Sequence, residues 1–141
     1  MTWILVNLNR HPEALAKLRV EIKENLPGLL TGEIEIPTMD DLQNLPYLEA
    51  VVKESLRFLR YRSIEECVCV AGGGMMMPPE RWIDPETGKV TAVSPFKFST
   101  FISGPRQCIG MSFALMKMRI ATAVLFSRFD LKTVQEPFDI S

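Results

Sequence analysis

The spacing of apolar residues predicts three helices in the first 59 residues. Residues 1–9 are apolar and compatible with a helix, which His11-Pro12 interrupts. From Pro12 onward, and again after Pro46, apolar side chains recur every three or four residues, as on one face of an amphipathic helix. The apolar positions are Leu15, Leu18, Ile22 and Leu26 in the second helix, and Leu48, Val52, Leu56 and Leu59 in the third.

The segment between the second and third helices carries turn and capping signals. Pro27-Gly28 is expected to end the second helix, and the stretch that follows is predicted to be a loop. Thr38 and Asp41 then match a capping box, in which the two side chains bond to each other's backbone N–H groups. We therefore expect a short helix from Thr38 to about Asn44.

The second half of the chain is less regular until its last helix. Residues 60–77 have no sustained period and are interpreted as an atypical insert, and residues 94–105 are predicted to form an irregular loop. Residues 109–126 are apolar on nearly every side, which is typical of a helix buried inside a larger protein. Residues 129–134 alternate weakly, as in a strand. The pattern predicts a mainly α chain with minor β structure, in three parts: 1–59, 60–77 and 78–141.

Composition narrows the class of protein. The chain has 141 residues, of which 47% are hydrophobic and 23% charged, so a folded globular chain is expected rather than a disordered one. A net charge of −1 gives no electrostatic reason to expect a nucleic-acid partner. No signal peptide or membrane span is visible. Three cysteines favour a reducing compartment, and the spacing of Cys67 and Cys69 is a weak match to a zinc site.

The segment from Phe101 to Gly110 has the chemistry that a thiolate ligand to iron requires. Cys108 stands at the predicted entrance of a helix, where free N–H groups favour an ionised sulfur. Gly104 and Gly110 allow the backbone to approach a flat macrocycle. Arg106 offers a forked cation for the anionic carboxylates of a haem, and Phe101 can shield the sulfur from water.

These residues match the haem-binding signature Phe-x-x-Gly-x-Arg-x-Cys-x-Gly at every fixed position, and the chain therefore resembles the cytochrome P450 family. The resemblance implies the C-terminal part of the mainly α-helical cytochrome P450 fold, with Cys108 as the axial ligand to the iron of haem b. It also implies a haem-binding role for Phe101, Gly104, Arg106 and Gly110. A buried structural cysteine on an Arg/Gly loop is the alternative reading of the same residues.

A second match lies upstream of the cysteine loop. Glu54 and Arg57 are three residues apart in the predicted third helix, so they share a face and can pair. In the family, such a Glu-x-x-Arg pair joins an arginine from a later Pro-x-Arg segment, and Pro79-Glu80-Arg81-Trp82 matches that segment. The resemblance implies that Glu54, Arg57 and Arg81 form a structural network under the haem loop, without a role in bond-making.

The family also implies an activity and its partners. We expect a monooxygenase that inserts one oxygen atom of O2 into a small hydrophobic substrate, with electrons from NADPH through a reductase. The region from Phe98 to Phe129 is most similar to the fatty-acid ω-hydroxylase branch. Lys117, Arg119 and Arg128 are interpreted as a solvated face rather than as a docking site for an acidic electron-transfer partner.

Several expectations concern what this chain lacks. The distal acid/alcohol helix of the family would lie upstream of Met1, so no catalytic residue is assigned within the chain. A full-length protein of this type is expected at the endoplasmic reticulum membrane through an N-terminal anchor that this sequence does not contain. We expect the 141 residues alone to be incomplete, poorly soluble and inactive. The alternatives are a non-catalytic haem-binding remnant and a helical interaction fragment that binds no haem.

Overall fold

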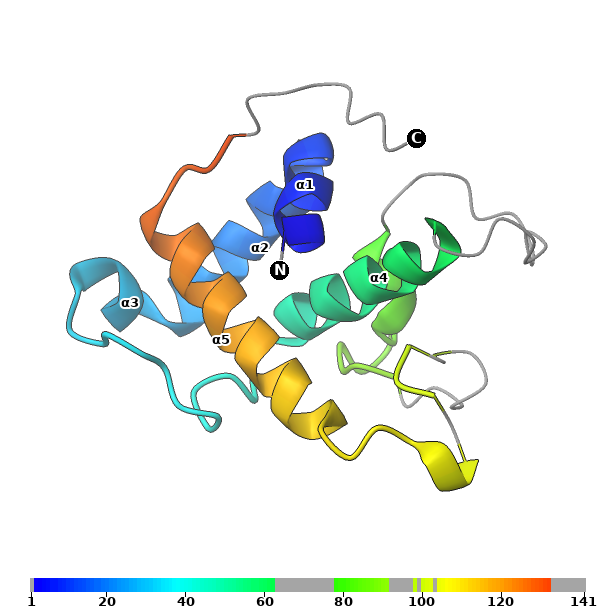
Figure 1. Ribbon diagram of the computed structural model, residues 1–141. Helices are drawn as coiled ribbons and strands as arrows, with labels where there is room; N and C mark the ends of the chain where they lie inside the picture. Colours follow the sequence, from blue (N-terminus) through cyan, green and yellow to red (C-terminus); the bar gives the residue numbers. More distant parts are fainter. Residues whose placement is uncertain (1, 63–77, 92–97, 99, 103, 133–141) are drawn as a thin grey trace.

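In the computed structural model, the chain folds into five α-helices and two short 3-10 helices within the described residues, which are 2–62, 78–91, 98, 100–102 and 104–132 (Figure 1). The side chains of residues 58–62 are not described. The helices are α1 (Thr2–Arg10), α2 (Pro12–Asn25), α3 (Pro27–Thr31), α4 (Pro46–Arg62), η1 (Pro79–Trp82), η2 (Gly104–Arg106) and α5 (Met111–Arg128). The predicted mainly α class is confirmed, and the only β structure in these ranges is an isolated bridge between Ile83 and Val90.

Proline begins most of the helices in the first half of the chain. Pro12, Pro27 and Pro46 each stand at the first residue of a helix. A proline is well suited to this position because its missing N–H has no partner there, and its fixed φ is already helical. The three predicted helices are therefore present, and α4 continues to Arg62, three residues past the predicted boundary at residue 59.

Two predictions between α2 and α4 are wrong. Pro27 starts the short helix α3 where a loop was expected, and Leu29 of this helix is fully buried. In contrast, residues 39–44 form turns rather than a helix. The expected capping box is present, with the Thr38 N–H 2.7 Å from Asp41 Oδ2, but the bonds that follow span only three residues. Pro46 disfavours helical backbone at Leu45, so these turns do not continue into α4.

α4 lies at the centre of the fold and contacts α1, α2, α5 and η1. One hydrophobic core forms around it, and α5 closes the core at its C-terminal end. Figure 1 shows α5 running from the yellow loop at its N-terminal end, past α4, toward α3. The largest buried side chains of this core include Leu8, Leu18, Ile22, Leu29, Leu48, Val51 and Val52.

The helix predicted for residues 109–126 is α5, but it is shifted by two residues and is buried only in part. Its buried side chains are Thr122, Ala123 and Phe126, all near its C-terminal end. At the other end Phe113 is 57% exposed. Further along the helix, Leu115, Met118 and Ile120 are only partly buried against the core, so this chain covers α5 incompletely. The predicted strand at 129–134 is absent from the described residues 129–132.

Candidate functional site

The loop before α5 is held by backbone hydrogen bonds at both of its ends. The Cys108 N–H donates to the Phe101 carbonyl at 2.9 Å, and the Met111 N–H donates to the Cys108 carbonyl at 3.2 Å. Between them, η2 turns the chain, and Gly104 begins it with a φ of +81°. Because L-residues with a Cβ are strained at such a φ, this turn favours glycine. The loop thus brings the backbone of Cys108 back into contact with that of Phe101.

The sulfur of Cys108 lies at the N-terminal end of α5. A Cβ built on Gly110, the residue that caps this helix, would lie 3.9 Å from Cys108 Sγ. The thiol is free and exposed. At the N-terminus of a helix the first N–H groups have no partner within the helix, and the helix dipole favours a negative charge. The geometry therefore suits a thiolate that binds a metal from the solvent side.

The residues around Cys108 fit a flat, largely apolar group with anionic substituents. Ile109, the residue after the cysteine, is fully exposed, and Phe113 at the start of α5 is more than half exposed, so exposed apolar side chains follow Cys108 along the chain. The Arg106 side chain is exposed and forms no ion pair with another residue of the described ranges. Phe101 is half-buried. An iron porphyrin has the matching properties: a metal for sulfur, an apolar face and carboxylates at its edge.

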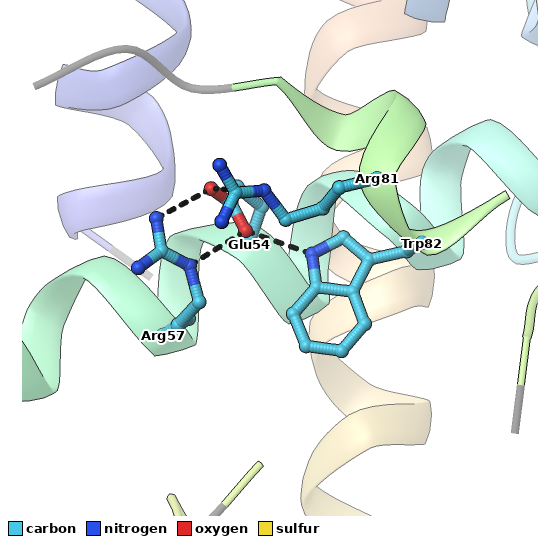
Figure 2. A network of polar contacts seen from close by, with 4 residues as sticks. All are labelled: Glu54, Arg57, Arg81 and Trp82. Atoms are coloured by element: carbon cyan, nitrogen blue, oxygen red, sulfur yellow. Dashed lines mark hydrogen bonds and ion pairs between the residues drawn. The ribbon is translucent and has the colours of Figure 1, made fainter. Parts of the chain in front are cut away.

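The second group of predicted residues meets at a buried carboxylate (Figure 2). The side chain of Glu54, on α4, is 1% exposed. Arg57 binds it with both arms of its fork, with Nε 2.9 Å from Oε2 and Nη2 2.7 Å from Oε1. Arg81, on η1, places its Nε 3.5 Å from Oε1. A buried charge is tolerated only when it is paired and hydrogen-bonded, and this network satisfies both conditions.

Trp82 is a further member of this network, beyond the three residues predicted from the sequence. Its indole Nε1 donates to Glu54 Oε2 at 2.8 Å, and the residue is buried. The only signal in the sequence was its position, directly after Arg81 in the matched segment. A tryptophan N–H usually finds an acceptor when the ring is buried, and the buried carboxylate supplies one.

The interpretation of Lys117, Arg119 and Arg128 as one solvated face is wrong for Arg119. Its side chain is 17% exposed and pairs with Glu49 of α4 at 3.3 Å. Arg128 is exposed but donates to the carbonyls of residues 34 and 35. Lys117 lies over the ring of Phe113, 4.9 Å from its centroid. Arg119 and Arg128 therefore connect α5 to the rest of the fold.

No group of three or more potential metal-binding His, Cys, Asp or Glu side chains occurs within the ranges the structure describes. Cys67 and Cys69 lie outside those ranges. Among the described helices, none has the length and apolar character needed to cross a membrane.

The fold, a loop that presents an exposed cysteine at a helix N-terminus, and the buried Glu-Arg network are together the features expected of a haem-thiolate class of protein. The family model for cytochrome P450 matches residues 1–63 and 76–140. The chain belongs to the cytochrome P450 family.

Similar proteins agree with this assignment. Leukotriene-B4 omega-hydroxylase 3 from Mus musculus is 34% identical over 93% of the chain. Probable cytochrome P450 12d1 proximal, mitochondrial, from Drosophila melanogaster is 31% identical over 94% of it. The chain spans about 30% of the length of the curated relatives it matches. The expected resemblance to the ω-hydroxylase branch is confirmed, although the second relative carries a different name. Members of this family use haem b as their cofactor and are reduced by NADPH through a reductase.

Proposed function

We propose that this chain forms the haem-binding part of a cytochrome P450 monooxygenase, in which the sulfur of Cys108 would bind the haem iron. The observation that carries the proposal is the position of the exposed Cys108 thiol at the N-terminus of α5, followed along the chain by the exposed Ile109 and Phe113. When bound, the haem supplies dioxygen activation and the transfer of one oxygen atom to an organic substrate.

Each residue of the loop has a distinct role in this proposal. Cys108 would hold the haem iron through its thiolate sulfur, and the N-terminus of α5 stabilises the negative charge of that sulfur. Arg106, which is exposed, binds a haem carboxylate through its guanidinium. Phe101 covers the sulfur from water, while Gly104 and Gly110 allow the loop to approach the macrocycle. Within the described part of the chain, no residue is proposed as a proton donor to dioxygen.

The network around Glu54 has a supporting role. It joins α4 to η1, and the η1 segment leads along the chain toward the haem loop. Glu54, Arg57 and Arg81 are structural residues in this proposal. They hold the proximal side of the site and take no part in bond-making.

The family and its named members support a proposal for the substrate and the redox partner. We propose a small hydrophobic substrate of the fatty-acid or lipid class, which the name of the mouse relative supports. We propose NADPH and a reductase as the source of the electrons that the reaction would need. We propose the endoplasmic reticulum membrane as the location of a full-length protein of this type.

The test is a reduced-carbonyl spectrum of the haem-reconstituted chain, compared with Cys108→Ser. We expect the red-shifted thiolate band for the wild type and its loss in the variant, because a serine hydroxyl does not replace a thiolate as an iron ligand. Cys67→Ser and Cys69→Ser are the matched controls, since they remove a thiol elsewhere, and both should keep the band.

Identical spectra for the wild type and Cys108→Ser would remove the thiolate assignment. The absence of haem binding altogether would favour a helical interaction fragment instead. A thiolate band in the wild type fits both part of an enzyme and a haem-binding remnant, and oxidation of a fatty acid by the chain with NADPH and a reductase would favour the enzyme.

A further inference from the structure

The connection between η1 and the buried carboxylate of Glu54 depends on Trp82 more than on Arg81. Trp82 is 4% exposed, and its Nε1 lies 2.8 Å from Oε2. The Arg81 side chain is 39% exposed, and its Nε lies 3.5 Å from Oε1. A long ion pair at the surface contributes little, whereas a short hydrogen bond to a buried carboxylate is among the stronger ones in proteins.

The same indole is also linked, through Phe98, to the haem loop, which comprises residues 101–110. Its ring meets Phe98 edge to face, with centroids 5.6 Å apart and an angle of 80° between the rings. Phe98 in turn lies against Phe101, with centroids 6.2 Å apart. The carbonyl of Phe101 accepts the Cys108 N–H at 2.9 Å. A continuous series of contacts therefore runs from Glu54 through Trp82 to the backbone of the cysteine.

The backbone of Trp82 is held independently of its ring. Its carbonyl accepts the N–H of Thr91 at 2.8 Å, and the next residue, Ile83, donates to the Glu80 carbonyl at 3.0 Å. The indole can therefore lose its hydrogen bond without releasing η1. Figure 2 shows the indole N–H directed at the Glu54 carboxylate from the side opposite Arg57.

We propose that Trp82 is a positioning residue that couples the buried carboxylate of Glu54 to the haem loop, through Phe98 and Phe101. The Glu54 carboxylate sets the orientation of the indole, and the two phenylalanine rings transmit that orientation to the carbonyl that holds Cys108. The consequence for haem ligation rests on the proposed role of Cys108 as axial ligand. The mechanical link itself does not require haem.

Two variants separate the hydrogen bond from the ring packing. Trp82→Phe keeps an aromatic ring against Phe98 but removes the donor to Glu54, and Phe98→Leu breaks the series at the next contact. Trp3→Phe, at the other tryptophan of the chain and on α1, is the matched control. The first measurement is amide hydrogen exchange of the haem-free chain, read at Cys108 and, for comparison, at Ile22 in α2.

Both variants should accelerate exchange of the Cys108 amide by roughly three- to tenfold, the range that follows from losing one hydrogen bond. Ile22 should exchange at the wild-type rate, and Trp3→Phe should leave Cys108 unchanged. An unchanged Cys108 amide in Trp82→Phe would overturn the proposal. Equal acceleration at Cys108 and Ile22 would also overturn it, because it would mark Trp82 as an ordinary core residue.

The second measurement is the reduced-carbonyl spectrum of the haem-loaded variants. Trp82→Phe should convert part of the thiolate band to the band of the non-thiolate form. If Cys108→Ser does not alter the spectrum while the exchange result holds, the proposed function fails and the positioning link stands. If Cys108→Ser abolishes the band and Trp82→Phe leaves both readouts at wild-type values, only the positioning proposal fails.

Discussion

Glu21 of α2 caps the first turn of α4 by accepting the backbone N–H of Tyr47 at 2.7 Å. Its second carboxylate oxygen accepts the N–H of Leu48 at 2.8 Å. The N-terminal N–H groups of a helix lack partners within the helix, and a side chain directly before the helix usually supplies them. Here the residue before Pro46 is Leu45, which has no polar side chain, so the acceptor comes from another helix.

Replacing Glu21 by Gln should destabilise the fold by about 1–2 kcal/mol, the usual value for losing a helix cap. The amide keeps one acceptor oxygen but directs an NH2 group at the second N–H. The measurement is urea unfolding of the haem-free chain at neutral pH. Glu24→Gln, an exposed position on the same helix, is the control. Equal unfolding midpoints for the two variants would contradict the capping role.

The same carboxyl should make stability depend on pH. Burial raises the pKa of Glu21 above its ordinary value of 4.5, although the N–H groups of Tyr47 and Leu48 act in the opposite direction. At pH values between 4.5 and the raised pKa of Glu21, the folded chain therefore binds more protons than the unfolded chain. The extra stability that protonated Glu21 provides is complete below pH 4.5 and is lost as the pH rises through the folded pKa, while the carboxylate keeps its two hydrogen bonds to the N–H groups of α4.

This dependence is isolated by comparing the wild type with Glu21→Gln. The difference between their unfolding free energies, measured at a series of pH values from acid to neutral, should decrease as the pH rises. Other carboxyls, such as Asp84 and Asp130, have lowered pKa values and affect both proteins alike. A difference that stays constant or increases with pH would show that the pKa of Glu21 is not raised.

Two glutamates of α4 should differ in their importance for stability. Glu54→Gln should cost about 3 kcal/mol, because removing one partner of a buried ion pair leaves the other charge uncompensated. Glu49→Gln is the matched control: Glu49 pairs with Lys53 at 2.8 Å and with Arg119, but its side chain is 26% exposed. It should cost less than about 1 kcal/mol. Similar losses in thermal or urea unfolding would argue against a buried network at Glu54.

The two glycines of the haem loop should respond differently to alanine. Gly104 has a φ of +81°, so Gly104→Ala should cost about 1–2 kcal/mol of stability even without haem. Gly110 has a φ of −87°, and an added Cβ would meet only Cys108 Sγ, at 3.9 Å. Gly110→Ala should therefore leave the haem-free fold within about 0.5 kcal/mol of the wild type.

Haem titration completes this comparison. Because the new methyl group of Gly110→Ala stands beside the sulfur, it should weaken haem binding by about tenfold. Unchanged haem affinity in Gly110→Ala would mean that the macrocycle does not approach this glycine. A fully stable Gly104→Ala would mean that the turn at η2 is not the native one.

The helices were predictable where the signal is local. The three- and four-residue spacing of Leu18 and Ile22 follows from helix geometry, and both side chains are buried in the core. The prediction failed at Pro27, where the same dipeptide signal suits a helix start as well as a break. It also failed at residues 39–44, where a capping box formed without a helix behind it.

The sequence by itself determined the family, the cysteine loop and the pairing of Glu54 with Arg57, because each depends on residues that are close along the chain or on a short motif. Only the tertiary structure decided that Trp82 donates to Glu54, that Arg119 is paired with Glu49, and that Glu21 caps α4. Each of these contacts joins different elements. Spacing along the chain does not indicate which polar groups of different elements meet, since that depends on how the helices pack.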